Sequence, residues 1–193
     1  NYQNNEFHDS VSLAFNPMLL KLVKKHINVP VTSNPPGFFC YPKRKRSNSP
    51  IKSLLHVGSL GNHHPKRREL IQSLLNRGQI PLFHTTTKTP EEAADLYSKY
   101  SLVLNIPLNN DLNHRFFEIL FSGAPQIIFG EKDLLGALQH LGNLPGIYWT
   151  NSLEELESLV SFLLNNHKQI NYPNNNIPTL SIKDFLLKSL SHK

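Results

Sequence analysis

An arginine and a glutamate stand three residues apart in a segment that is otherwise strongly apolar. Arg115 and Glu118 share one face of a short predicted helix at about 113–122, since residues three apart on a helix are neighbours. A charged pair on so apolar a helix is costly to bury unless its members pair or face a ligand. Two alternatives fit equally well: a local salt bridge, or a site in which Glu118 accepts hydrogen bonds from ribose hydroxyls and Arg115 contacts phosphate.

A second candidate is a glycine turn after an apolar strand, Gly58-Ser59-Leu60-Gly61. It leads to a helix that begins near Pro65, and the free N–H groups at a helix start favour phosphate. The turn matches neither the dinucleotide-binding nor the P-loop signature, so a tight turn and an anion site are equal alternatives. Arg67 and Arg68 follow, about 100° apart around the helix, and at most one of them can face the site. A solvated basic face is the favoured explanation of these two arginines.

Metal chemistry has little support in the sequence. His63 and His64 are adjacent, but no third ligand stands at a familiar spacing, so we expect no metal. Cys40 has no Cys-x-x-Cys partner and is given no chemical role. A single cysteine cannot form an internal disulfide, which suits a reducing compartment. Because the chain also shows no signal peptide, we expect a cytoplasmic protein.

The candidate residues stand beside the elements of a regular strand–helix alternation. Two helix starts are marked by capping boxes, in which Thr89 and Ser152 each precede a glutamate by three residues. The expected strands are 51–57, 80–84, 101–106, 126–129 and 147–149. The expected helices are 65–77, 90–99, 113–122, 132–141, 152–166 and 181–189.

This alternation predicts an α/β fold with a doubly wound, Rossmann-like parallel sheet. The strands SLVLNI and QIIF are apolar throughout, as expected when helices cover both faces. Ligands of such sheets bind at the carboxyl ends of the strands. Asn105 and Asn110 stand at the end of one central strand and in the loop after it. The loops expected to bind a ligand are 58–64, 84–89, 106–112, 129–132 and 149–152.

Composition divides the chain into three parts. Residues 1–32 include a predicted helix at 17–26, with a looser turn before it, and a short β-branched strand at 27–32. Residues 33–50 are rich in Pro, Gly and Ser and predict a linker. Residues 51–193 predict one α/β domain closed by a C-terminal helix. The chain does not begin with Met, so we expect a piece of a longer protein.

The 193-residue chain is basic, with a net charge of +6 from 20 Lys plus Arg against 14 Asp plus Glu. Such a balance favours anionic partners. Nucleic acid is an unlikely one, because there is no aromatic-interleaved basic stripe, helix-turn-helix or zinc-finger spacing. The cluster Lys43-Arg44-Lys45-Arg46 is better explained as a solvated part of the linker. No apolar run approaches the roughly 20 residues that span a bilayer, so no membrane span is expected.

Three segments, in their order and spacing, resemble the carboxyl-terminal domain of GT-B glycosyltransferases. These segments are LLHVGSLG…KRREL, ADLYSKYSLVLNI and LNHRFFEILFSGAPQIIF. Residues 51–166 are most similar to the CgeB-like group and its "glycosyl transferases group 1" relatives. The segment NPPGFFCYP is similar to the family's interdomain segment. The resemblance therefore implies that residues 1–32 are the end of a preceding N-terminal domain.

The resemblance also implies a domain that binds the nucleotide of a nucleotide-diphosphate sugar, whose sugar passes to an unknown acceptor. Glu118 matches the family's ribose-binding glutamate, and Gly58 and Ser59 match the glycine turn near the diphosphate. Arg67 or Arg68 matches a basic position in the following helix, and we take Arg68 as the site residue. The remaining expected donor-binding residues are Asn105, Asn110 and Arg115.

The chain departs from the family in two places. Many GT-B enzymes have a second glutamate eight residues before the first, where this chain has Asn110, and their Arg-x4-Lys phosphate pair is absent. The family's acceptor site and catalytic base usually lie in the first domain, so no catalytic residue is assigned and the piece is expected to be inactive alone. No cofactor is implied beyond the nucleotide sugar as substrate. The alternative, which Asn110 favours, is a non-catalytic interaction module that retains the fold.

Overall fold

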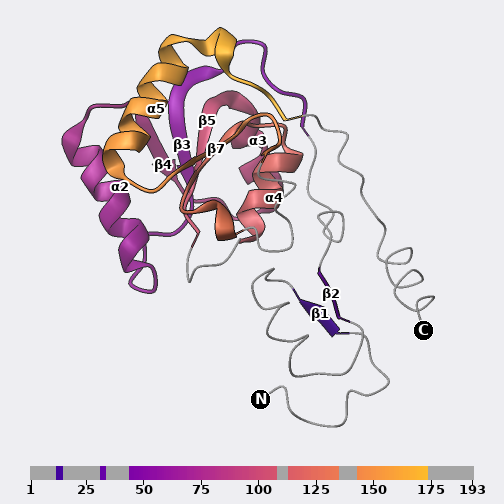
Figure 1. Cartoon of the computed structure of the whole chain (residues 1–193). Helices are drawn as coiled ribbons and strands as arrows, with labels where there is room; N and C mark the ends of the chain where they lie inside the picture. The colour runs from indigo at the N-terminus through magenta and orange to yellow at the C-terminus, as the bar shows by residue number, and fades with distance from the viewer. Residues whose placement is uncertain (1–11, 15–30, 34–43, 108–112, 135–142, 174–193) are drawn as a thin grey trace.

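The computed structural model describes residues 12–14, 31–33, 44–107, 113–134 and 143–173 (Figure 1). Their strands and helices alternate along most of the chain, which confirms the α/β class. In chain order the elements are β1 (Ser12–Ala14), β2 (Val31–Ser33), β3 (Ile51–Val57), α2 (Pro65–Arg77), β4 (Leu82–Thr85), α3 (Pro90–Lys99), β5 (Tyr100–Asn105), α4 (His114–Phe121), β6 (Gln126–Phe129), β7 (Ile147–Thr150), α5 (Leu153–Asn165) and the 3-10 helix η4 (His167–Gln169).

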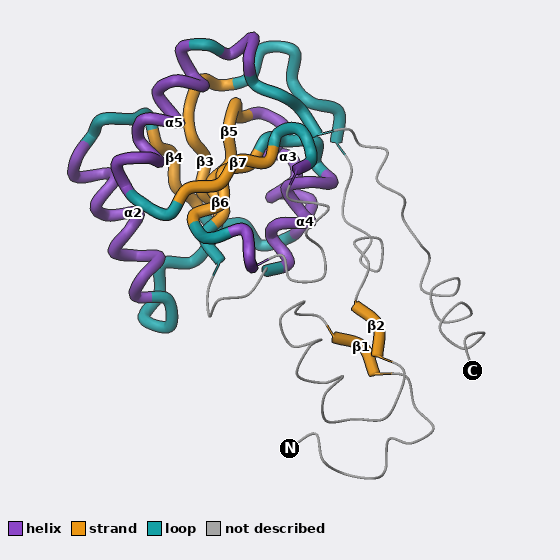
Figure 2. Tube along the Cα trace, in the orientation of Figure 1, coloured by secondary structure: helices purple, strands orange, loops and turns teal. Residues whose placement is uncertain are grey.

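Five of these strands form one parallel sheet, in the order β4-β3-β5-β6-β7 (Figure 2). The chain runs from β3 outward to β4, returns across β3 to β5, and then continues through β6 to β7. The direction of winding therefore reverses beside β3. This order is that of a doubly wound, Rossmann-like sheet, so the fold predicted from the sequence is confirmed.

Helices cover both faces of the sheet, with α2 and α5 on one side and α3 and α4 on the other (Figure 1). Successive residues of a strand point to opposite faces, so Leu54 packs with the first pair of helices and Leu55 with the second. The first core includes Leu54, Ile71, Leu74, Leu102, Leu104, Val160 and Leu163. The second face holds Leu55, Val57, Tyr97, Val103 and Ile119, next to a cluster of Phe116, Leu120 and Ile128.

The helix ends follow the signals in the sequence. Thr89 and Ser152 accept hydrogen bonds from backbone N–H groups three residues on, each at 3.2 Å, which starts α3 and α5 as capping boxes do. Asn113 caps α4 in the same way. Gly78 ends α2 in the left-handed conformation, with φ of 60°, a region that glycine enters without steric cost.

Some strands differ from the prediction. The strand expected at 80–84 begins at Leu82, because Pro81 has no N–H group to donate to the ladder. Strand β1 stands where a looser turn was expected, and it pairs in parallel with β2. The predicted helices at 17–26 and 181–189, and most of the one at 132–141, lie outside the described residues. In the part of the chain that is described, every helix is too short or too polar to cross a membrane.

The sequence suggested that the basic cluster before β3 is solvated, but one of its arginines, Arg46, makes several contacts with the domain. The guanidinium of Arg46 donates to the carbonyl oxygens of Tyr97 (3.2 Å), Tyr100 and Ser101 (3.1 Å), where α3 ends and β5 begins. The same group lies 4.9 Å from the centre of the Tyr172 ring. Carbonyls at the end of a helix lack partners within the helix. Arg46 therefore caps α3 from a distant part of the chain.

Replacing Arg46 with alanine should destabilise the domain, because it leaves these carbonyls without their donor. Hydrogen bonds to charged groups contribute about 1.5–3 kcal/mol net, and we expect a loss of that order in the free energy of unfolding measured in urea. Lys45→Ala is the matched control, since Lys45 is exposed, and it should change stability little. Equal stability of the two variants would show that the cap contributes nothing.

Candidate functional site

The reversal of winding places two strand ends where a ligand is expected. Strands β3 and β5 are neighbours in the sheet, but the chain leaves their carboxyl ends toward opposite faces. After β3 it enters α2, and after β5 it enters α4. In open parallel sheets this divergence leaves the crevice in which ligands bind. The loop after β5 lies partly outside the described residues, so the site is described here from β3, β4 and the three nearest helices.

Gly58, the first residue after β3, is the point on which two arginines converge. A Cβ atom at position 58 would lie 2.5 Å from Nη1 of Arg115 and 3.4 Å from Nη1 of Arg67. The two side chains come from α4 and α2, which cover opposite faces of the sheet. Any residue other than glycine would displace the Arg115 guanidinium from this position, so glycine permits the close approach of Arg115 to the strand end.

Arg67 is buried, with 8% of its surface exposed. Its Nη1 and Nη2 donate to the backbone carbonyls of Ser59 (3.4 Å) and Ile106 (3.3 Å), which tie α2 to the ends of β3 and β5. Its Nε has no hydrogen-bond partner within the described ranges. Burial lowers the pKa of Arg67, and the nearby charge of Arg115 lowers it further. A guanidinium nevertheless stays charged at neutral pH.

Arg115 is also incompletely paired. Its Nε lies 3.8 Å from Oε2 of Glu118, which is too long for a hydrogen bond. Nε and Nη1 of Arg115 are buried, and neither has a hydrogen-bond partner among the residues described. Buried donors are normally satisfied. Two cations that meet at Gly58 with free donors therefore make a site suited to an anion.

Tyr97 approaches the same charges from α3. Its side chain is fully buried, and its hydroxyl has no partner at hydrogen-bond distance in the described structure. Burial raises the pKa of Tyr97; Arg115 opposes the rise, and Glu118 adds to it. The phenol therefore lies near both members of the ion pair and bounds the site on the α3 side.

Two histidines complete the cluster at the ends of β3 and β4. His56 and His84 are opposite each other in the register, and their Nδ1 atoms are 2.9 Å apart. His56 is only 1% exposed, and burial lowers its pKa to about 3, with the charges of His84, Arg115 and Arg67 acting in the same direction. Burial also lowers the pKa of His84. At neutral pH both rings are uncharged, and one donates to the other.

The structure selects Arg67 rather than Arg68 as the arginine that faces the site. Arg68 turns away and donates to the side chain of Asn62 at 3.0 Å. Arg67, and not the Arg68 that we chose from the sequence, therefore lies beside Gly58, because neighbours on a helix point about 100° apart. The sequence shows that only one of the two can face inward, but not which one.

The other residues that we expected in the site do not all lie beside the two arginines. Ser59 is exposed, and its Oγ accepts the N–H of Gly61 at 3.1 Å. Asn105 is fully buried, and its Nδ2 donates to Gln126 at 3.4 Å, so it joins β5 to β6 beneath the site. Asn110 lies outside the described residues. Among the seven expected site residues, the structure thus brings Gly58, Arg115 and Glu118 together.

The pair of His56 and His84 was missed by sequence reasoning, which considered only His63 and His64. A signal was present, since each histidine is the penultimate residue of its strand: LLHV is aligned with LFHT. Parallel alignment of two such strand ends brings the side chains together. His63 and His64 are separate from this pair, and across the described ranges no group of three or more His, Cys, Asp or Glu side chains could hold a metal ion.

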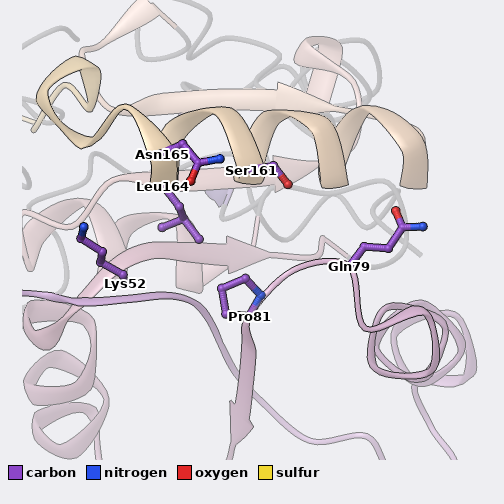
Figure 3. A pocket seen from close by; sticks show the side chains of 6 residues that line it. All are labelled: Lys52, Gln79, Pro81, Ser161, Leu164 and Asn165. Carbon is purple, nitrogen blue, oxygen red and sulfur yellow. The ribbon is translucent and has the colours of Figure 1, made fainter.

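A pocket of about 330 Å³ lies at the opposite edge of the sheet (Figure 3). Its walls come from the start of β3, the chain before β4 and the last turns of α5. The side chains around it are Lys52, Gln79, Pro81, Ser161, Leu164 and Asn165. Most of these side chains are exposed, and Lys52 is the single charged one. The pocket contains none of the expected site residues and lies at the amino ends of the strands, away from the arginines.

Fold and site together define a Rossmann-like α/β domain with a cationic site at its switch point. Comparison of the chain with protein-family models, with curated proteins and with solved structures found no match. The function is therefore argued from the geometry of the site and from the resemblance in the sequence.

The lowered pKa of His56 predicts that the protein loses stability in acid. Between about pH 6.5 and pH 3 the unfolded chain binds a proton at this residue and the folded chain does not. Stability should therefore fall as the pH drops through this window, by up to about 1.4 kcal/mol per pH unit from this one group. Unfolding free energies of the wild type and His56→Asn, measured across the window, should show the shallower slope in the variant. His63→Asn should retain the wild-type slope, and identical slopes in all three proteins would contradict the assignment.

Proposed function

We propose that this domain binds the diphosphate of a nucleotide sugar and serves as the donor-binding part of a glycosyltransferase. The observation that carries the proposal is the convergence of Arg67 and Arg115 on Gly58 at the carboxyl edge of the sheet. Both guanidiniums keep buried nitrogens without a partner in the described structure. An anionic ligand with several oxygens would satisfy these donors and neutralise the two charges.

The geometry suits phosphate oxygens in particular. Nη1 of each arginine lies within 3.4 Å of the same point above Gly58, so the two cations are close enough to hold one phosphate group between them. A carboxylate offers two oxygens, whereas the two phosphates of a nucleotide sugar together offer four non-bridging oxygens. Charge-assisted bonds from guanidinium to phosphate are short and frequently bidentate. A diphosphate therefore uses the available donors more completely than a single carboxylate does.

Glu118 supplies the contact that would distinguish a nucleotide from a simple phosphate. It is 23% exposed and lies beside Arg115 on α4, so its carboxylate is within reach of both the phosphate site and solvent. A ribose presents two neighbouring hydroxyl donors, which a carboxylate can accept. The sugar-transfer part of the proposal rests on the resemblance of residues 51–166 to GT-B glycosyltransferases. The resemblance places the acceptor site and the catalytic base in another domain.

A second candidate is a non-catalytic interaction module that keeps the fold. It is favoured by the ion pair of Arg115 with Glu118, which gives Glu118 a role without any ligand. Asn110, in the place of a glutamate of many GT-B enzymes, points the same way. The two candidates differ in whether nucleotide diphosphates bind at all.

The arginine site predicts different effects of two adjacent substitutions. Arg67→Gln removes a buried donor beside Gly58 and should weaken the binding of UDP, GDP or ADP about tenfold or more, because hydrogen bonds to charged groups contribute about 1.5–3 kcal/mol. Calorimetry on the full chain measures the affinities. Arg68→Gln is the matched control, since Arg68 contacts Asn62 instead, and its affinity should equal that of the wild type. Equal losses of affinity in both variants would indicate a diffuse charge effect. If the wild type binds none of the three nucleotides, the proposal is overturned in favour of the non-catalytic interaction module.

Substitution of Glu118 separates its two roles. Glu118→Gln keeps the shape but exchanges one acceptor oxygen for a donor, so nucleotide binding should weaken about tenfold, with little change in melting temperature. Inorganic pyrophosphate has no ribose, and its affinity should be unchanged. If the residue serves only Arg115, the result reverses: the melting temperature falls and nucleotide affinity is unaltered.

A further inference from the structure

The histidine pair stands at the same point as the two arginines. A Cβ atom at position 58 would lie 3.4 Å from Cε1 of His56, the distance at which it would also meet Arg67. Side chains from β3, α2 and α4 thus surround one point, and His84 on β4 lies directly behind His56. The proposed diphosphate site uses the arginines and leaves these two imidazoles without a role.

The contact between the rings constrains where their protons can be. Two Nδ1 atoms at 2.9 Å form a hydrogen bond only when one of them carries a proton and the other accepts. In the uncharged pair either ring can be the donor. When His84 takes up a proton, both of its nitrogens carry one, so Nδ1 of His56 must accept. The single proton of His56 is then on Nε2, which is bonded to the Cε1 that faces position 58.

Burial first, and then the charges around the pair, explain why it is uncharged when no anion is bound. The groups that act on His56 are His84 on β4, Arg115 on α4 and Arg67 on α2. Burial lowers the pKa of His84, and a hydrogen bond to the backbone of His56 acts in the opposite direction. Among the described residues no carboxylate acts on either ring, because Glu118, on α4, lies against Arg115 instead. A bound anion would supply the missing negative charge and favour a proton on His84.

We propose that the His56–His84 pair belongs to the anion site and takes up one proton when an anion with two negative charges binds between Arg67 and Arg115. The proton binds to His84, the more exposed ring, and His56 presents its Nε2–H to the ligand as a third donor. This inference rests on the anion-binding part of the proposed function. It adds a preference for ligands with two negative charges, which the diphosphate of a nucleotide sugar carries over its two phosphates, and a dependence of affinity on pH.

Sulfate is the probe for the test, because it stays a dianion throughout the range in which histidine titrates. Any proton taken up on binding must then bind to the protein. NMR titration of the full chain with sulfate should give an affinity that rises as the pH falls from about 8 to about 5.5. Uptake of one proton corresponds to as much as about tenfold per pH unit. Saturation with sulfate should also raise the titration midpoint of the His84 imidazole.

Two variants locate the effect. His84→Asn retains a group that can bond to Nδ1 of His56 but does not titrate, so sulfate should bind with nearly the same affinity at every pH in the range. His63→Asn removes an exposed histidine from the loop before α2 and should keep the full pH dependence. An unchanged pH dependence in His84→Asn would overturn the proposal, as would a wild-type affinity that does not vary with pH.

The same measurements distinguish failure of the histidine proposal from failure of the proposed function. Sulfate binding without pH dependence removes the role of the histidines and leaves the arginine site intact. If sulfate binds with the expected pH dependence, the role of the histidine pair is supported. If UDP, GDP and ADP then bind no more tightly than pyrophosphate, the nucleotide is excluded as the ligand. Failure of sulfate to bind at any pH overturns both.

Discussion

The constraint on which the site depends is the absence of a side chain at position 58. The guanidinium of Arg115 occupies the space that a Cβ atom would need, and that of Arg67 lies at contact distance from it. Each guanidinium repels the other in a partly buried setting. The carbonyls of Ser59 and Ile106 hold Arg67 in place, while Glu118 offsets part of the charge of Arg115. The arrangement is possible because α2 and α4 approach the same strand end from opposite faces of the sheet.

The interior beneath the site holds α4 in position by a chain of amide hydrogen bonds. Asn105 at the end of β5 donates to the side chain of Gln126 in β6, which in turn donates to the carbonyl of Phe116 at 3.0 Å. These three residues are fully buried. Buried amides that are hydrogen-bonded in sequence favour one arrangement of the elements that they join. Asn105, expected to contact the ligand, is thus connected through Gln126 to the backbone of the helix that carries Arg115.

The fold was predictable from the sequence because its signals are local. Capping boxes at Thr89 and Ser152, and Gly78 after α2, mark helix ends with groups a few residues apart. The site depends instead on relations that periodicity does not contain. Whether Arg67 faces inward depends on how α2 packs against the sheet. The contact between His56 and His84, which are 28 residues apart in the chain, depends on the register of β3 and β4. The cap that Arg46 provides for α3 is likewise non-local.

Stability alone does not account for the buried charges. Replacing a buried ion cluster by apolar side chains of similar size is often neutral or stabilising, and Phe116, Phe117 and Leu120 show that α4 already packs through apolar residues. Arg115 nevertheless lies among them with buried nitrogens that no described residue accepts from. Arg67 adds a second charge of the same sign, and His56 adds a buried imidazole. Such a cluster is costly without a counter-charge, and this cost is the physical reason for the proposal that an anion binds there.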